Sequence, residues 1–150
     1  MSDPKVTVCP KCGQKNRVRA AAGAVPHCGK CGAPLPWLVE AGAADFEAAV
    51  EKAPLPVLID FWAPWCGPCR IVAPAVEHLS EELAGKLKVA KLNTDDEPEL
   101  GERFGVRAIP TLILMEDGRE RDRVTGALNV NALRSWVDTR LSAGRHRPRR

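Results

Sequence analysis

The first 36 residues of this chain contain no aromatic side chain; the first is Trp37. Proteins that bind single-stranded nucleic acid stack bases on aromatic rings, so this segment lacks that platform although it carries six Lys/Arg against one Asp. We therefore expect a solvated basic face and no nucleic-acid partner. Large apolar side chains are also few, too few to form a core, so the segment needs another source of stability. These side chains are Val6, Val8, Val18, Val25 and Leu35.

Long apolar stretches are missing as well. No uncharged run reaches the ~18 residues that a membrane span needs, and no apolar segment of the secretory kind follows Met1 to Lys5. We expect a soluble, cytoplasmic, monomeric protein without a membrane partner. Thiols stay reduced in the cytoplasm, so six cysteines in 150 residues indicate metal ligands or redox catalysts rather than structural disulfides.

Charge divides the chain into three parts. Residues 1–36 carry a net charge of +5, residues 37–140 a net charge of −6, and the last ten residues four arginines. Such asymmetry is typical of segments with different roles. We expect a small domain at 1–36, a main domain at 37–142 and a flexible basic tail at 143–150.

Four cysteines lie in the small N-terminal domain as two CxxC pairs with fifteen residues between them. This spacing is typical of a four-cysteine zinc site, because Zn²⁺ prefers a tetrahedron of soft ligands. Structural zinc contributes on the order of 10 kcal/mol to folding, which would supply the missing stability. We expect one Zn²⁺ at Cys9, Cys12, Cys28 and Cys31, and we expect oxidants to release it by removing its thiolate ligands. The alternatives are a disordered tail or two local disulfides.

The remaining pair is Cys66 and Cys69, separated by Gly67 and Pro68. An apolar strand is expected before it, and apolar residues recur at helical spacing after it. Cys66 therefore falls at a helix N-terminus, where the macrodipole favours a thiolate and lowers the pKa of an attacking cysteine. Cys69 follows one turn later, close enough to form a disulfide with Cys66.

The stretch from Trp65 to Cys69, Trp-Cys-Gly-Pro-Cys, resembles the signature of the thioredoxin family. The resemblance covers about residues 37–142 and implies an α/β thioredoxin fold, a mixed central sheet flanked by helices. Residues 1–36 resemble the zinc-ribbon-like extension of some bacterial thioredoxins. The family implies a protein-disulfide reductase in which Cys66 attacks and Cys69 resolves the mixed disulfide. Its implied partners are protein disulfides and an NADPH-dependent flavoprotein thioredoxin reductase, and it implies no organic cofactor.

Two further positions match the family's proton-transfer groups. Asp60 lies in an otherwise apolar strand, so burial should raise its pKa toward neutrality. The matching family residue serves as acid/base for the second cysteine, and Lys91 matches the lysine beside it. The alternative is that Asp60 and Lys91 form only a structural ion pair.

The substrate-binding rim is also implied by the resemblance. Pro110 matches a cis-proline that packs against the sulfurs, and the backbone of Ile109 would pair with an extended substrate. Gly126 and Ala127 match a loop that completes a flat rim with Trp65 and Ile109.

Two other functions remain open from the sequence. The same fold serves disulfide oxidases and isomerases, although Gly67-Pro68 matches the reductants. A zinc-dependent binding adaptor with a vestigial redox site is the second alternative. Insulin reduction and a reduction potential would separate the three.

Elsewhere, the residue patterns predict alternating strands and helices followed by a hairpin. The expected strands are 37–39, 57–62, 87–93, 111–115 and a hairpin strand ending at Val124. The expected helices are one capped by Asp45, one from the cysteine pair to about Leu83, one opened by Pro98 and one capped by Asn129.

Overall fold

The computed structural model describes residues 4–146, with side chains described as far as Leu141. A five-stranded mixed sheet forms its centre, in the order β3-β5-β4-β6-β7. β3, β5 and β4 run parallel, whereas β6 and β7 are antiparallel to their neighbours. The strands are β3 (Leu38–Glu40), β4 (Val57–Trp62), β5 (Lys88–Asn93), β6 (Thr111–Glu116) and β7 (Arg119–Thr125).

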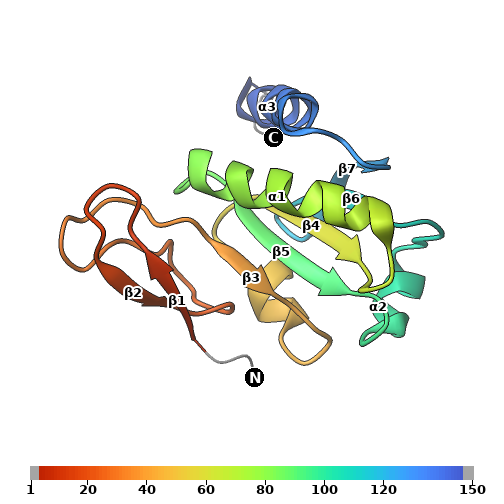
Figure 1. The fold of residues 1–150 in the computed structure, drawn as a ribbon, viewed down its shortest axis with the longest axis horizontal. Coiled ribbons are helices and arrows are strands. Elements are labelled where there is room, and N and C mark those ends of the chain that lie inside the picture. The colour runs from red at the N-terminus through yellow and green to blue at the C-terminus, as the bar shows by residue number, and fades with distance from the viewer. Residues whose placement is uncertain (1–3, 147–150) are drawn as a thin grey trace.

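Helices cover both faces of this sheet (Figure 1). α1 (Gly67–Glu82) and α3 (Val130–His146) pack on one face, and the single-turn helix η1 (Glu47–Glu51) and α2 (Pro98–Arg103) lie on the other. Because side chains alternate along a strand, each central strand supplies both cores: Leu58 faces α1, and Ile59 faces η1. The sheet confirms the predicted thioredoxin fold.

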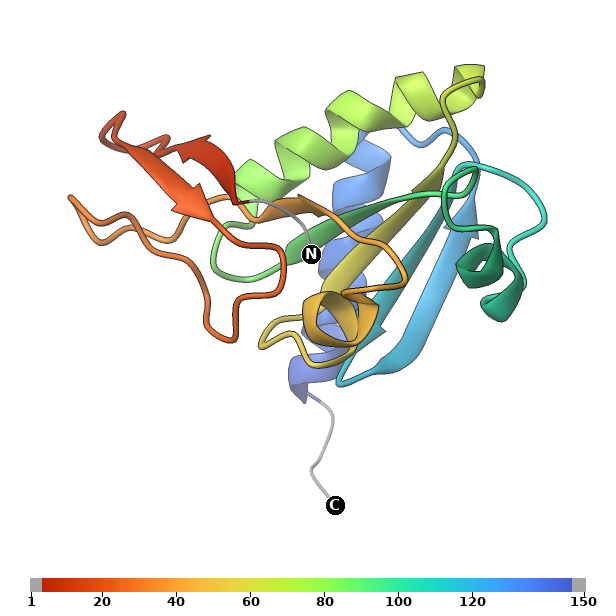
Figure 2. The ribbon, with the colours of Figure 1, turned by 90° about the horizontal axis from the view of Figure 1, so that it is seen from below.

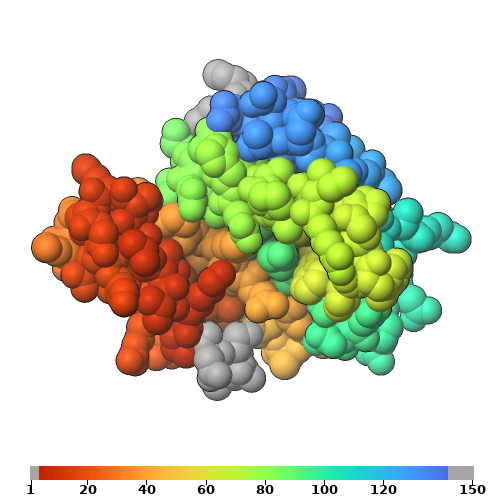
Figure 3. Space-filling model, viewed as in Figure 1, coloured from red at the N-terminus to blue at the C-terminus, as the bar shows by residue number. Residues whose placement is uncertain are grey.

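The N-terminal segment is a small lobe at the end of the molecule where α1 finishes (Figures 1 and 2). Its hairpin consists of β1 (Lys5–Val8) and β2 (Lys15–Val18), which pair antiparallel. In the space-filling view this lobe lies directly against the rest of the molecule (Figure 3). Its side chains Val18, Ala20 and Leu35 share a core with Trp37, η1 and the sheet. The expected boundary at residue 36 therefore runs through packed side chains.

Lys88 joins the lobe to the sheet. Its side chain is fully buried, and its Nζ donates hydrogen bonds of 2.5 Å to the carbonyls of Ala20 in the lobe and Ala49 in η1. Nζ also lies 4.0 Å from the centre of the Trp37 ring, whose Nε1 donates to the carbonyl of Arg19. Burial lowers the pKa of Lys88 to about 8, and the nearby Asp45 carboxylate acts in the opposite direction.

Two elements differ from the sequence prediction. The N-cap residue of η1 is Phe46 rather than the expected Asp45, whose side chain accepts the backbone N–H of Gly42 at 2.9 Å. An Asx-type bond to a nearby backbone group competes with capping in this way. In addition, α3 continues to His146, so its last four residues lie in the expected flexible tail that begins at residue 143. The rest of that tail, residues 147–150, lies outside the described residues.

The other helix predictions are confirmed. α1 begins at the cysteine pair and contains Pro74, and Asn129 caps α3 by accepting the backbone N–H of Ala132 at 2.9 Å. Leu133 and Val137 form the buried side of α3. Among the described residues, no helix combines the length and apolar character that crossing a membrane requires.

Candidate active site and four-cysteine cluster

Cys66 and Cys69 form a disulfide at the start of α1, with their Cα atoms 5.3 Å apart. Cys66 is the N-cap residue of α1, with extended backbone dihedrals, and its Sγ accepts the backbone N–H of Cys69 at 3.2 Å. The first N–H groups of a helix have no partner within it, so the sulfur takes the place of a capping oxygen. Once reduced, Cys66 would be a thiolate in a position that stabilises negative charge.

The residues between the sulfurs explain this placement. Pro68 has no N–H to leave unpaired, and its fixed φ suits the first turn of a helix. Gly67 is exposed, and a Cβ built there would meet nothing within 4 Å. The cysteine pair is thus held by backbone geometry, with open space beside it.

Two loops lie next to the disulfide. The Ile109–Pro110 peptide bond is cis, and the carbonyl oxygen of Ile109 lies 3.7 Å from Cys66 Sγ. Gly126, with φ of 117°, donates its N–H to the carbonyl of Pro110 at 2.9 Å. Pro110 is buried, Ile109 packs against the disulfide, and Ala127 is exposed beyond Gly126.

Trp65 presents the largest exposed apolar surface beside the disulfide. Its side chain is 69% exposed, and its Nε1 donates to Asp95 Oδ1 at 3.1 Å. This bond holds an apolar ring at the surface. The residues predicted for substrate binding from the sequence, Trp65, Ile109, Gly126 and Ala127, therefore come from three loops, and Ile109 lies directly against the sulfurs.

Asp60 lies behind the disulfide, on the face of β4 that α1 covers. It is 1% exposed, and its Oδ1 has no hydrogen-bond partner among the described residues. Burial raises the pKa of Asp60 to about 6, while the charge of Lys91 acts in the opposite direction. Lys91 is the register neighbour of Asp60 on β5, and its Nζ lies 5.1 Å from the centre of the Trp62 ring.

A small cavity of about 110 Å³ links Asp60 to the second cysteine. Asp60, Cys69 and Lys91 all line it, together with Ala73 from α1. The space is sufficient for water. Asp60 and Cys69 thus border one water-sized space.

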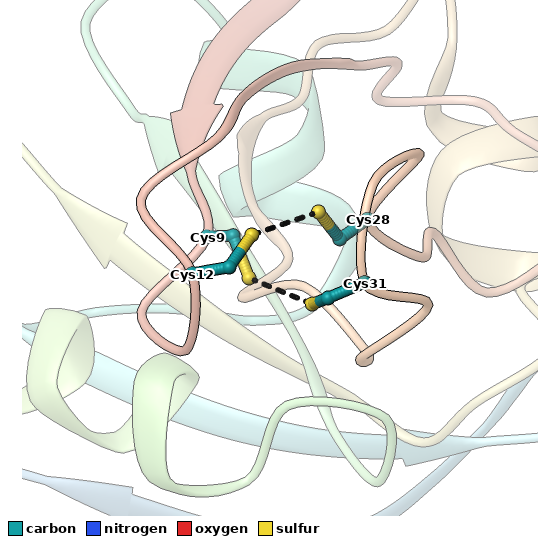
Figure 4. Close-up of side chains that lie close together, drawn as sticks. All are labelled: Cys9, Cys12, Cys28 and Cys31. Atoms are coloured by element: carbon teal, nitrogen blue, oxygen red, sulfur yellow. Dashed lines mark hydrogen bonds between the residues drawn. The ribbon is translucent and has the colours of Figure 1, made fainter.

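The other four cysteines meet in the N-terminal lobe (Figure 4). Their Sγ atoms all lie within 4.8 Å of one another, and two pairs across the turns, Cys9–Cys31 and Cys12–Cys28, lie at 3.6 Å. Zn–S bonds of about 2.3 Å in a tetrahedron require sulfurs about 3.8 Å apart. The cluster therefore has the size and the donor set of a four-thiolate metal site.

Matching turns hold the two pairs. Gly13 and Gly32 follow them with positive φ of 81° and 78°, and each donates its N–H to the carbonyl of the first cysteine of its pair. Hydrogen bonds lower the pKa of Cys28 to about 6, the largest contribution coming from the backbone N–H of Cys31, while burial acts in the opposite direction. Hydrogen bonding, chiefly by the backbone N–H of Cys12, also lowers the pKa of Cys9. One thiol in each turn is thus favoured as thiolate, the form that binds metals.

The two cysteine sites lie at opposite ends of α1 (Figures 1 and 2). The disulfide is at the N-terminus of α1, whereas the lobe with the four cysteines lies beside its C-terminal end. From residue 4 onward, the lobe does not cover the redox site (Figures 1 and 2).

Sequence patterns did not single out three side chains that the structure places at these sites: Asn16, Lys88 and Asp95. Asn16 contacts Cys28, Lys88 joins the lobe to the sheet, and Asp95 holds Trp65. Each acts on a segment more than ten residues away, so no local pattern marks it. The single hint is Lys88 itself, a charged residue at the start of a strand in which Val89, Ala90 and Leu92 are apolar.

The site combines a CxxC disulfide at a helix N-terminus with a buried carboxyl behind it and a cis-proline loop beside it. This combination is typical of a thiol–disulfide oxidoreductase. Comparison with known proteins agrees with this class. The family model described as Thioredoxin matches residues 37–139, so the chain belongs to the thioredoxin family.

Relatives align over the same length. A thioredoxin of Synechocystis sp. (strain ATCC 27184 / PCC 6803 / Kazusa) is 48% identical over 98 residues, which cover 65% of this chain and 92% of the relative. A thioredoxin of Rickettsia bellii (strain RML369-C) is 43% identical over 96 residues, 64% of this chain and 91% of the relative. The four-cysteine cluster precedes the residues that the family model matches.

Proposed function

We propose that this protein reduces disulfides in other proteins by dithiol–disulfide exchange. The observation that supports it most is the capping bond from the Cys69 N–H to Cys66 Sγ at the start of α1. This bond stabilises a thiolate at Cys66 more than at Cys69, so Cys66 is the nucleophile.

The exchange has two steps. The Cys66 thiolate attacks one sulfur of the substrate disulfide; a mixed disulfide forms, and the other substrate sulfur leaves as a thiolate and takes up a proton. Cys69, once deprotonated, attacks Cys66 Sγ, so the Cys66–Cys69 disulfide forms and the second substrate thiolate leaves. Two electrons pass from the protein to the substrate.

Asp60 assists the second step. With a pKa raised to about 6, it is a base strong enough to accept a proton from Cys69 through the shared cavity, and it can return that proton to the leaving thiolate. The charge of Lys91 lowers the pKa of Asp60 and so opposes the effect of burial. Gly67 and Pro68 keep the cysteines in the first turn of α1.

Substrates bind at the flat rim around the disulfide. Trp65, Gly126 and Ala127 offer shallow apolar contacts, which suit many protein surfaces. We expect the backbone of Ile109, next to Pro110, to pair with an extended substrate segment; the Ile109 carbonyl oxygen, 3.7 Å from Cys66 Sγ, supports this expectation. The partner that restores the dithiol is an NADPH-dependent flavoprotein thioredoxin reductase, and the protein acts as a cytoplasmic monomer.

The four-cysteine cluster binds one structural Zn²⁺. Its sulfur spacing and its thiolate-favouring turns support this assignment. Bound zinc would cross-link the two turns, which the few apolar side chains of the lobe cannot hold together alone.

Two serine variants test the assigned roles. We expect Cys66→Ser to abolish insulin reduction and to trap no substrate. We expect Cys69→Ser to accumulate a covalent substrate complex through Cys66, because the resolving thiol is missing. Mass spectrometry of the complexes is the measurement, and normal turnover by Cys69→Ser would contradict the assignment. A protein that binds zinc but cannot reduce insulin would instead be an adaptor.

A further inference from the structure

Asn16 is one polar side chain that bonds to both turns of the four-cysteine cluster. It lies half-buried on β2, next to the end of the first turn. Its Oδ1 accepts the backbone N–H of Gly29, inside the second turn, at 3.0 Å. Its Nδ2 donates to the carbonyl of Gln14 at 3.0 Å and lies 3.6 Å from Cys28 Sγ, within hydrogen-bond reach of the sulfur.

These contacts require the chemistry of a carboxamide. Asparagine carries a donor and an acceptor on one short side chain, so it can bond the backbone of both turns at once. A carboxylate of the same shape would keep the bond to Gly29 but would have no N–H for Gln14 or Cys28.

The sulfur of Cys28 receives a second donor from the backbone, the N–H of Lys30 at 3.4 Å. Two N–H groups from different segments therefore converge on one sulfur. N–H donors reduce the charge that a thiolate ligand must carry, and groups that orient metal ligands typically change metal affinity by about 10- to 100-fold.

Gln14, two residues away, makes a useful comparison. Its side chain is exposed and donates only to the carbonyl of the adjacent Lys15 among the described contacts. It touches neither the second turn nor a cysteine sulfur. Of these two polar side chains, Asn16 is thus the one that connects the turns among the described contacts.

We propose that Asn16 is a positioning residue of the metal site: it holds the Cys28–Cys31 turn against the first turn and orients Cys28 Sγ as a ligand. This inference rests on the proposed metal binding. It assigns no part of the disulfide chemistry to Asn16.

The test uses the full-length reduced protein and two metals. Zinc affinity is measured by competition with a chromophoric chelator, and Co²⁺ replaces zinc for absorption spectra. We expect Asn16→Ala to weaken zinc binding by about 10- to 100-fold. Asn16→Asp should weaken it at least as much, because it removes the N–H donor and adds a negative charge beside the sulfurs. Gln14→Ala is the matched control and should stay within threefold of the unsubstituted protein.

The Co²⁺ spectrum separates orientation of the ligand from a general structural effect. Removing an N–H···S bond raises the energy of the sulfur lone pair, so the sulfur-to-cobalt charge-transfer band should shift to lower energy in both Asn16 variants. If the N-terminal lobe of Asn16→Ala fails to fold, Asn16→Asp provides the test of the N–H donor, because this variant keeps the bond to Gly29.

Two different failures are distinguishable. In the first, the unsubstituted protein binds zinc, both Asn16 variants have zinc affinities within threefold of it, and their charge-transfer bands are unshifted. That result would overturn the role of Asn16 and leave metal binding intact. Absence of zinc or cobalt binding in the unsubstituted protein would overturn the metal site itself.

Discussion

Asp60 combines nearly complete burial with an unpartnered carboxylate oxygen. A buried carboxyl without a paired cation favours its neutral form, because burial penalises the charge. Lys91 reduces this penalty but does not remove it. The fold therefore holds a group that is costly at neutral pH, which agrees with the proposed role of Asp60 as the acceptor of a proton from Cys69.

The Asp60→Asn substitution should stabilise the fold in a pH-dependent way. The pKa of Asp60 rises from 3.8 to about 6 on folding. The folded state thus holds a proton that the unfolded state has lost, and stability declines as pH rises through this window. We expect the variant to gain up to about 3 kcal/mol in unfolding free energy above pH 7, at 1.36 kcal/mol per pKa unit, and little near pH 3.

Denaturant unfolding at both pH values measures this gain in unfolding free energy. In stopped-flow kinetics, resolution of the mixed disulfide by Cys69 should be slower, with the attack step by Cys66 little changed. Asp96→Asn, at an exposed position after β5, is the control and should remain within about 0.5 kcal/mol at both pH values. An Asp60→Asn variant impaired only in attack would contradict the role given to Asp60.

The single strand β5 contacts both the N-terminal lobe and the cavity beside the disulfide. Lys88 at its start points toward the lobe and η1, and Lys91, three residues later, lines the Asp60 cavity on the opposite face. The alternation of side chains along a strand accounts for this division. β5 thus carries two lysines that face opposite sides of the sheet and contact different parts of the molecule.

Replacing Lys88 by Met should loosen the attachment of the lobe. The change retains an unbranched apolar chain but leaves the carbonyls of Ala20 and Ala49 without their donor, and each buried unsatisfied group costs about 1–3 kcal/mol. Removal of a buried charge offsets part of this cost. We expect a net loss of about 1–3 kcal/mol and faster tryptic cleavage at Arg17 and Arg19.

Lys86→Met is the matched control, since Lys86 is exposed two residues earlier. It should unfold and be cleaved like the unsubstituted protein. Equal behaviour of the Lys88 and Lys86 variants would show that the lobe is held by its apolar contacts alone.

In the whole molecule, the Cys66–Cys69 disulfide and the four-cysteine cluster are far apart. The disulfide and the four-cysteine cluster lie at opposite ends of α1, so their sulfurs cannot exchange within one molecule without unfolding. The shared core around Trp37 nevertheless ties the lobe mechanically to the sheet.

Removal of zinc by peroxide should therefore affect the two regions unequally. We expect release of about one zinc per chain and new tryptic cleavage at Lys11, Lys15 and Lys30, which lie in or beside the turns. The sheet and α1 should stay folded and retain insulin reduction, but with a lower Tm, because Val18, Ala20 and Leu35 belong to the common core.

Zinc analysis, limited proteolysis and calorimetry of the same samples measure these three effects. Cooperative unfolding of the entire chain on zinc loss would contradict the expectation, as would zinc-free protein freshly purified under reducing conditions. Chelation in place of peroxide controls for oxidation of Cys66 and Cys69.

Features that depend on neighbours along the chain could be predicted from the amino-acid sequence. Apolar periodicity located β4 and α1, the Gly67-Pro68 turn located the cysteines at a helix N-terminus, and the spacing of the other four cysteines located a candidate metal site. Capping, turn geometry and side-chain periodicity act within a few residues, so the chain carries these signals locally.

Contacts between distant segments could not be predicted in this way and became visible in the folded chain. Lys88 bonds to residues 68 and 39 positions away, and Asn16 reaches a sulfur 12 positions away. Three other features likewise follow from packing: the cavity that joins Asp60 to Cys69, the burial of Leu35 and the separation of the two cysteine sites. Packing depends on the shapes of all the elements together, and no local pattern records it.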